Sequence, residues 1–252
     1  MMKYPFWVIK SDAKRLLRGK WNPLVLALFI PFLLFVAFQV RFTMQLEAMP
    51  PTQELPKYLL LAEAVTVVFT VVMQLLTVGI YENLKPTREK ASFFSVYAVA
   101  AKKSWKMLPT LIVGVVLPSA LSYLLTSNGP IRFYDYLMFS VMDMQTYQVL
   151  LVVALYLVQL LGIYLQYSLL LVPAITVEHP EFGPLRLMKE SFLLTRGNRF
   201  YLFMMAFSFI GWMILGALAF YIGVLWALLY MYAANYAYYR RITVSEEPLN
   251  LA

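Results

Sequence analysis

The chain has 252 residues, of which 62% are hydrophobic and only 13% are charged, a composition far from that of an average soluble domain. Several uninterrupted apolar stretches reach the ~20 residues that are needed to cross ~30 Å of hydrocarbon. The net charge of +8 does not indicate nucleic-acid binding, because the basic residues lie in loops beside these stretches, and the absence of cysteine excludes disulfides, thiolate metal sites and cysteine nucleophiles. We therefore expect an all-α, polytopic membrane helix bundle that forms one domain over residues 1–252.

Residues 1–20 have the pattern of an amphipathic helix at the membrane surface. One face is apolar and another is basic, with Ile9, Ala13, Leu16 and Leu17 on the first and Lys10, Lys14, Arg15 and Arg18 on the second. Gly19 ends this helix, and a short turn leads into the first predicted span, residues 24–40. A signal peptide would also place a basic segment before an apolar one. This apolar run is long for a signal peptide, however, and no small-residue cleavage site follows it, which favours an uncleaved anchor.

Five further spans are predicted, with two more surface helices between them. The spans cover about residues 58–80, 107–125, 147–172, 200–218 and 222–239. Pro118 predicts a kink in the third span. One surface helix is indicated by the spacing of Phe94, Tyr97, Ala101 and Trp105, and the other by Pro184 at a first helical position and Gly197 at a C-terminal cap. Residues 131–146 are amphipathic and aromatic, which indicates a short helix on the outer surface.

The distribution of lysine and arginine gives the predicted orientation. Nearly all of them fall in residues 1–20, 82–106 and 173–199 or directly after the sixth span, whereas the opposite side holds only Arg41, Lys57 and Arg132. Cytoplasmic loops carry the excess of positive charge in membrane proteins. We therefore expect a protein of the bacterial cytoplasmic membrane with six spans and both termini in the cytoplasm.

The basic segments share a plan, in which a surface helix and a basic, aromatic turn precede an outward span and a return span. We interpret residues of these turns as anchors for lipid headgroups: Arg15, Arg18, Lys20, Trp21, Lys102, Lys103, Trp105, Arg196 and Arg199. An internal repeat with its axis along the membrane normal would explain the shared plan. The need for basic and aromatic anchors at every cytoplasmic junction explains it as well, and the sequence does not separate the two.

The return spans carry polar residues at helical spacing, whereas the outward spans have few. Polar groups are costly in hydrocarbon unless they are paired, so we expect the return helices to line the bundle interior and the outward helices to face lipid. Interhelical hydrogen bonds without any cavity are the alternative explanation. The predicted binding residues are Glu63, Thr66, Thr70 and Gln74 in the second span, Gln159 and Gln166 in the fourth, and Tyr232 and Asn235 in the sixth.

Few residues suggest chemistry. Glu63 is an intramembrane carboxylate, which suggests a function, but it lies about one turn inside its span and could equally reach the outer interface. His179 is the only histidine, and the proline after it breaks the helical geometry of a zinc site. Asp135 and Asp143 could form an acid/base pair, although solvated surface carboxylates explain them better. We therefore predict no catalytic residue, no metal and no cofactor.

The C-terminal third carries motifs of a known family. They are Lys189-Glu190-Ser191, Leu194-Thr195-Arg196-Gly197-Asn198-Arg199, Ser208-Phe209-Ile210-Gly211-Trp212 and Ile222-Gly223 with Leu225-Trp226. With these motifs, and with Ala13 to Trp21 near the start, the chain resembles the bacterial integral-membrane family called domain of unknown function 975, common in Gram-positive bacteria. Leu229 departs from the family pattern, which has a proline there. The resemblance implies a six-pass fold and a kinship with the membrane-anchor domains of glycerophosphodiester phosphodiesterases, and it implies no catalytic residue.

Three functions are compatible with these features. The leading hypothesis is a non-enzymatic protein whose interior binds an amphiphile, a lipid or a peptide, in order to export it or to keep it from harming the membrane. The polar stripes and the walls rich in tyrosine and methionine motivate it. The second is a structural or accessory subunit with a membrane-protein partner. The third is an intramembrane enzyme that uses Glu63, or Asp135 with Asp143. Membrane lipids are expected partners under each hypothesis, and nucleic acid under none.

Overall fold

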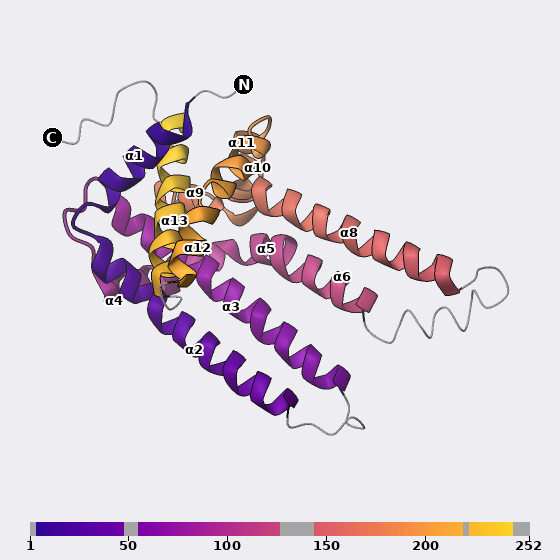
Figure 1. Cartoon of the computed structure of the whole chain (residues 1–252). Helices are drawn as coiled ribbons and strands as arrows, with labels where there is room; N and C mark the ends of the chain where they lie inside the picture. The colour runs from indigo at the N-terminus through magenta and orange to yellow at the C-terminus, as the bar shows by residue number, and fades with distance from the viewer. Residues whose placement is uncertain (1–3, 48–54, 127–143, 219–221, 244–252) are drawn as a thin grey trace.

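The computed structural model describes residues 4–47, 55–126, 144–218 and 222–243, and every regular element in these segments is a helix (Figure 1). Within these described segments, five helical stretches are long and apolar enough to cross a membrane: Trp21–Gln45, Leu60–Leu84, Phe93–Leu125, Val149–Glu178 and Arg199–Leu218. The predicted all-α class is confirmed, and the helices are those of a multi-pass membrane protein.

The sixth predicted span lies within α13 (Ile222–Thr243), which is not among these five. From Tyr230 onward it is rich in tyrosine, and several side chains there are buried against the rest of the protein: Tyr230, Asn235, Tyr236, Tyr238 and Tyr239. Polar atoms on these side chains make α13 less apolar than the other long helices. The six-span count therefore stays a prediction. The surface helix predicted at 131–146 falls almost wholly outside the described residues.

The N-terminal helix α1 (Phe6–Leu17) packs along α13, and its apolar face is buried. The Tyr230 hydroxyl donates a hydrogen bond of 3.1 Å to the Lys10 carbonyl, and Arg241 forms an ion pair with the buried Asp12. The sequence predicts that the apolar face of this helix contacts the membrane surface. In the structure, that face packs largely against the protein itself. An amphipathic pattern requires an apolar neighbour but does not specify which one.

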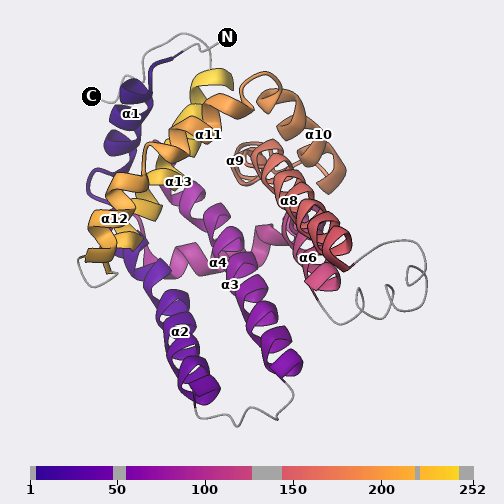
Figure 2. The same cartoon turned by 45° about the vertical axis from the view of Figure 1, so that its right-hand side comes forward.

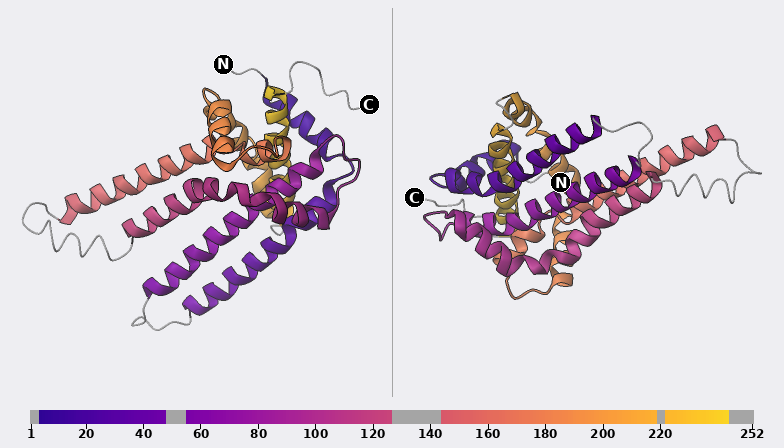
Figure 3. Two further views of the ribbon diagram at one scale, coloured as in Figure 1. Left: turned by 180° about the vertical axis from the view of Figure 1, so that it is seen from behind. Right: turned by 90° about the horizontal axis from the view of Figure 1, so that it is seen from below.

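Two pairs of long helices extend from the base that α1 and α13 form. α2 (Trp21–Glu47) packs on α3 (Leu55–Leu84), and α6 (Leu117–Thr126) packs on α8 (Met144–Ser168). The two pairs diverge away from the base in Figure 1 and in the view from behind in Figure 3, and Figure 2 shows them from another side.

Next to the base, α4 (Phe93–Lys103) crosses α3, and the two helices pack very closely there. A Cβ atom added to Gly79 of α3 would lie 2.1 Å from the Val96 carbonyl oxygen of α4, so the two backbones touch directly. Glycine is the only residue that allows this approach. This contact fixes the position of α4 against the helix pair formed by α2 and α3.

Proline shapes the first span through a contact with α4. Pro31 lies inside α2 and has no N–H with which to bond the carbonyl of Ala27, four residues earlier. The Tyr97 hydroxyl of α4 donates a hydrogen bond of 2.7 Å to that carbonyl instead. A backbone acceptor that the sequence leaves without its helical partner is therefore satisfied by tertiary structure.

The kink predicted at Pro118 appears as a π-helical turn, Ile112–Val116, between α5 (Leu108–Leu111) and α6. Pro118 lacks the amide that would pair with the Gly114 carbonyl in a regular helix. The irregular turn therefore forms one turn before the proline and is centred on Gly114. Such π turns are frequent at functional sites.

The predicted helix ends marked by glycine and proline are confirmed. Gly19 and Gly197 adopt φ angles of 73° and 80° just after α1 and α10 (Pro184–Thr195), a left-handed conformation that favours glycine. Pro184 is the first residue of α10, where its missing N–H costs nothing.

The fourth predicted span, 147–172, is interrupted near its end, because α8 stops at Ser168 and the short α9 (Val172–Glu178) follows. The buried Ser191 hydroxyl in α10 donates a hydrogen bond of 2.8 Å to the Ser168 carbonyl. The Thr195 hydroxyl lies 3.3 Å from the same carbonyl and 2.8 Å from the Ser191 carbonyl of its own helix. Ser191, a motif residue of the C-terminal third, thereby satisfies an acceptor that the end of α8 otherwise leaves unpaired.

The fifth span consists of α11 (Arg199–Phe207) and α12 (Ile210–Leu218), with a break at Ser208. α12 turns back onto α13, where Gly216 and Gly223 meet. A Cβ atom on Gly216 would lie 2.5 Å from the Gly223 carbonyl carbon. Small residues allow two helices to pack this closely.

Candidate binding cavities

Two adjoining cavities lie between α3, the third span and α8. The proximal cavity, next to the base, has a volume of about 340 Å³, and the distal cavity has one of about 270 Å³. The two adjoin one another, because they share four wall residues: Thr70, Gly114, Val115 and Gln166. α13 contributes only to the proximal cavity, through Leu228, Met231, Tyr232 and Asn235.

The eight predicted binding residues all line these cavities. Gln74, Tyr232 and Asn235 line the proximal cavity, Glu63, Thr66 and Gln159 line the distal cavity, and Thr70 and Gln166 line both. The fold thus brings together polar stripes from three helices that lie far apart in the sequence. Their role in binding a ligand stays a prediction.

α8 differs from the expectation that return helices lie inside the bundle. In the most apolar part of the span that contains it, 0% of the residues are buried, compared with 39% in the span of α3. α8 packs mainly on α6 at the edge of the molecule, so it offers its polar side to the cavities and its remaining surface outward. The polar stripe predicted which side faces the cavities, but not how much of the helix would be covered.

Most hydroxyls along α3 are satisfied by their own helix. Thr66 and Thr70 each donate a hydrogen bond of 2.9 Å to the carbonyl four residues earlier, a common arrangement for threonine in a helix. Between α8 and α6, the Gln159 carboxamide donates a hydrogen bond of 3.2 Å to the Ser122 hydroxyl. Hydrogen bonding within the protein explains these residues without a ligand.

Three polar groups of the proximal cavity lack such partners. Thr110 is only 4% exposed, and its hydroxyl makes no hydrogen bond. The carboxamides of the half-buried Gln74 and the exposed Gln166 also hydrogen-bond to no other described residue. Leaving a buried group such as the Thr110 hydroxyl unpaired costs about 1–3 kcal/mol, which is why such groups usually mark a place where a water or a ligand completes the structure.

Thr110 and Gly114 are wall residues that the sequence analysis missed. Both lie in an outward span, which the analysis assigned to lipid. The π turn places Gly114 at the wall, and a Cβ atom added there would meet only Leu169 Cδ1, at an ordinary 3.5 Å. The available signal was Pro118, because it removes the amide that the Gly114 carbonyl needs and so predicts irregular backbone at that point.

The cavity walls are nearly without charge. Among the described residues that line either cavity, Glu63 is the one with a charged side chain, and none is a lysine or an arginine. The described part of the chain contains no group of three or more histidine, aspartate or glutamate residues that could hold a metal ion. The arrangement is suited to binding an apolar molecule with a few hydrogen-bonding groups.

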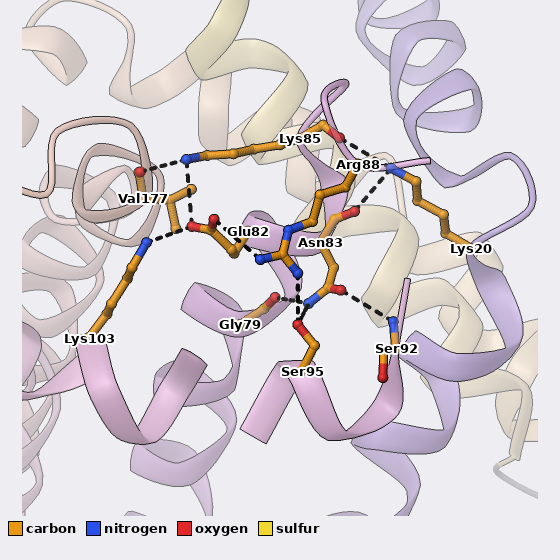
Figure 4. Close-up of polar contacts among 10 residues, drawn as sticks. All are labelled: Lys20, Gly79, Glu82, Asn83, Lys85, Arg88, Ser92, Ser95, Lys103 and Val177. Atoms are coloured by element: carbon orange, nitrogen blue, oxygen red, sulfur yellow. Dashed lines mark hydrogen bonds and ion pairs between the residues drawn. The ribbon is translucent and has the colours of Figure 1, made fainter. Parts of the chain in front are cut away.

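A second concentration of polar residues, the Glu82 cluster, lies where α3 ends against α4 (Figure 4). The Glu82 carboxylate contacts Lys103 at 2.8 Å, Lys85 at 3.5 Å and Arg88 at 3.7 Å. Lys85 also donates a hydrogen bond of 2.9 Å to the Val177 carbonyl of α9. One carboxylate thereby joins the ends of α3, α4 and α9.

Lys20 and Asn83 complete the Glu82 cluster. The buried Asn83 side chain accepts a hydrogen bond of 3.3 Å from the Ser92 amide at the start of α4. Lys20 is 6% exposed and donates to the carbonyls of Asn83 and Lys85 at 3.0 and 3.2 Å. Burial of its ammonium lowers the pKa of Lys20, and the charge of Arg88 acts in the same direction. Because these side chains bind one another and the backbone, the Glu82 cluster is a structural joint.

The predicted headgroup anchors fall into two groups. The ammonium groups of Lys20 and Lys103 differ from the expectation, because they bind protein oxygens in the Glu82 cluster. The Arg199 guanidinium likewise donates to the Tyr164 hydroxyl. Trp21 packs near Tyr230, with ring centroids 6.2 Å apart. The exposed members are Arg15, Arg18, Lys102, Trp105 and Arg196, and their contact with lipid stays a prediction.

A family model described as "Protein of unknown function (DUF975)" matches residues 2–246, nearly the whole chain. No curated protein and no solved structure matches the chain significantly. The matched region includes both cavities and the Glu82 cluster. The kinship with phosphodiesterase membrane anchors has no support in these comparisons.

Proposed function

We propose that this chain, which belongs to the DUF975 family of proteins of unknown function, binds an amphiphilic molecule, a lipid or a peptide, in its two adjoining cavities. It does so as a non-enzymatic, six-pass protein of the bacterial cytoplasmic membrane, with both termini in the cytoplasm. Binding serves either to export the amphiphile or to sequester it from the bilayer.

A contact between the two ends of the described chain supports the sixth span. Arg241, in the last turn of α13, lies 5.3 Å from the Tyr4 ring and also pairs with Asp12 of α1. Chain ends that touch lie on the same side of a membrane, whereas five spans would place them on opposite sides. The 22 residues of α13 extend about 33 Å, which is long enough to supply the sixth crossing.

The observation that carries the proposal is the unpaired Thr110 hydroxyl at the wall of the proximal cavity. A nearly buried hydroxyl without a partner is costly in an empty protein and is relieved by a molecule that offers a hydrogen bond. The unpaired carboxamides of Gln74 and Gln166 on the same walls act in the same direction. Around them the wall is apolar, with Phe69, Met73 and other large side chains, which suits the chain of an amphiphile.

The position of the cavities favours entry from the bilayer rather than from water. Gln159 and Gln166 line the cavities and are also exposed, so the cavities open between the two diverging helix pairs. The surface around this opening is formed by α8, whose side chains are largely exposed and apolar, including Leu157 and Leu160. An amphiphile in the bilayer would reach the cavities laterally.

The test is native mass spectrometry of the protein extracted gently from its own membrane, compared with a variant in which the cavity is filled. We expect a defined lipid or peptide adduct on the wild type that is lost in Gly114→Leu. Gly211→Leu is the matched control, because a Cβ atom at the exposed Gly211 meets nothing within 4 Å. An adduct that survives Gly114→Leu, or a protein that carries only another subunit, would count against the proposal and favour a structural role in a membrane complex.

A second pair of variants separates a binding role from a packing role. Gln74→Leu should weaken the adduct, because it removes an unpaired carboxamide from the cavity wall. Gln39→Leu makes the same change on α2, away from both cavities, and should leave the adduct unchanged. Equal effects of the two substitutions would show that polarity in the spans matters only for packing.

A further inference from the structure

We infer that the two cavities select a cationic amphiphile with one apolar chain, held with its positive group at Glu63 and its chain directed toward Thr110. The inference rests on the proposed function and specifies the ligand class that it leaves open. Three observations carry it: the isolated charge of Glu63, the direction of polarity along the cavities, and their length.

Among the residues that the structure describes, the Glu63 carboxylate has no cationic partner. It lines the distal cavity, and no described lysine or arginine lines either cavity. Among the described residues, no ion pair or hydrogen bond involves its side chain. A carboxylate in this position within a membrane span is unfavourable by itself and favourable beside a positive charge. The Glu82 cluster shows the contrast, because there every cation within reach is engaged with protein oxygens.

The polarity of the cavities changes from one end to the other. The distal cavity has Glu63 together with neutral polar residues such as Ser119 and Gln159, whereas the proximal cavity is dominated by apolar side chains and has no charged residue. A ligand with its charge at one end and an apolar chain at the other matches this order. An anionic headgroup would meet repulsion from Glu63 and would find no cation in either wall.

The length of the cavities indicates an extended chain rather than a compact ligand. Along α3 the lining runs from Glu63 to Tyr81, which at the rise of an α-helix corresponds to about 27 Å. Unpaired groups lie along the cavities, with Gln166 shared between the two and Thr110 in the proximal one. An amide or ester between the cationic end and the apolar chain would supply a hydrogen bond to Gln166, where the two cavities adjoin.

The experiment measures equilibrium binding of two radiolabelled probes with the same chain, dodecyltrimethylammonium and the uncharged dodecyl maltoside, to the protein in lipid nanodiscs. We expect the wild type to bind the cationic probe more tightly. Glu63→Gln should weaken binding of the cationic probe about tenfold, equivalent to about 1.4 kcal/mol, and leave the uncharged probe unchanged. Glu63→Asp should retain most of the preference, and Glu89→Gln in an exposed position should have no effect.

The outcomes separate this inference from the proposed function. If Glu63→Gln changes neither probe while Gly114→Leu abolishes binding of both, the cavities bind amphiphiles but do not select a cation, and the inference is wrong. If the wild type binds neither probe above the level of empty nanodiscs, both the inference and the proposed function fail. Loss of the cationic probe alone in Glu63→Gln, with loss of both in Gly114→Leu, supports both.

Discussion

The Glu82 cluster and the proximal cavity lie next to each other on α3 and satisfy their polar groups in opposite ways. Tyr81 lines the cavity, and the next residue is the centre of the cluster. In the cluster, charged side chains bind one another and backbone carbonyls. In the cavity, the polar groups are neutral, and the buried Thr110 hydroxyl has no partner among the described residues. Polar residues thus connect helices in the Glu82 cluster, whereas in the proximal cavity they line an open volume.

The difference follows from the cost of burying each kind of group. An unpaired charge is too costly to leave inside a protein, so charged residues near the ends of spans must find partners, and the carbonyls at helix ends provide them. A neutral hydroxyl or carboxamide costs far less and can remain available for a ligand or water. The contrast predicts that substitutions in the Glu82 cluster will act on the stability of the protein, whereas substitutions in the cavity will act on ligand binding.

The largest effect should come from closing the direct backbone contact beside the Glu82 cluster. Gly79→Ala places a Cβ atom 2.1 Å from the Val96 carbonyl oxygen, and neither backbone can move without separating α3 from α4. We expect the yield of monodisperse protein after extraction to fall several-fold, measured by fluorescence-detected size exclusion. Gly114→Ala at the cavity wall, where the nearest atom is 3.5 Å away, should keep the wild-type yield. Equal yields of the two variants would remove the distinction between a packed and an open region.

Removing the central carboxylate should have the next largest effect. Glu82→Ala leaves Lys103, Lys85 and Arg88 without their common partner, and breaking a largely buried ion pair costs about 3 kcal/mol. A lower midpoint of thermal unfolding in nanodiscs is the expected result. Lys103→Met should lose most of its own effect in the Glu82→Ala background, because the two residues share one interaction. Fully additive effects would show that Glu82 does not organise the cluster.

Tyr97→Phe tests whether tertiary structure satisfies the carbonyl that Pro31 leaves unpaired. Loss of the hydrogen bond from Tyr97 to the Ala27 carbonyl should lower the free energy of unfolding by about 1–2 kcal/mol. In a Pro31→Ala background, the restored amide can bond that carbonyl, and Tyr97→Phe should then cost less. A cost that does not depend on residue 31 would contradict this explanation.

The smallest change in stability is expected in the cavity. Thr110→Val removes an unpaired hydroxyl and should change the free energy of unfolding by less than about 0.5 kcal/mol, or raise it, because no hydrogen bond is lost. Thr195→Val is the matched control, since its buried hydroxyl donates to the Ser191 carbonyl, and it should destabilise the protein by about 1 kcal/mol. Thr110→Val should nevertheless weaken the bound amphiphile. A destabilised Thr110→Val without any loss of ligand would assign Thr110 to packing.

The residues predicted for the cavities show what a single sequence can reveal about a site. The sequence predicted several of the cavity-lining residues because polar groups repeat at helical spacing on apolar helices: Glu63, Thr70, Gln74, Gln159 and Asn235. This pattern can be recognised without knowing which helices are neighbours. Thr110 was not predicted, because a single hydroxyl in a span forms no periodic pattern. Such a hydroxyl is expected to hydrogen-bond to the backbone of its own helix. Lys20 was assigned to lipid because its charge is visible in the sequence, while the carbonyls that receive it are not.

The sequence by itself determined the all-α membrane class, the approximate positions of five apolar helical stretches, the glycine and proline positions that end helices, and the polar sides of α3, α8 and α13. These features depend on composition, on periodicity and on local backbone limits, all of which act within a few turns of chain. Only the tertiary structure decided that α1 packs on α13, that α8 lies at the edge, and that Tyr97 completes α2. Those outcomes depend on which distant segment packs on each apolar face or donates to each unpaired carbonyl. Local sequence shows that a contact is required but not which residue provides it.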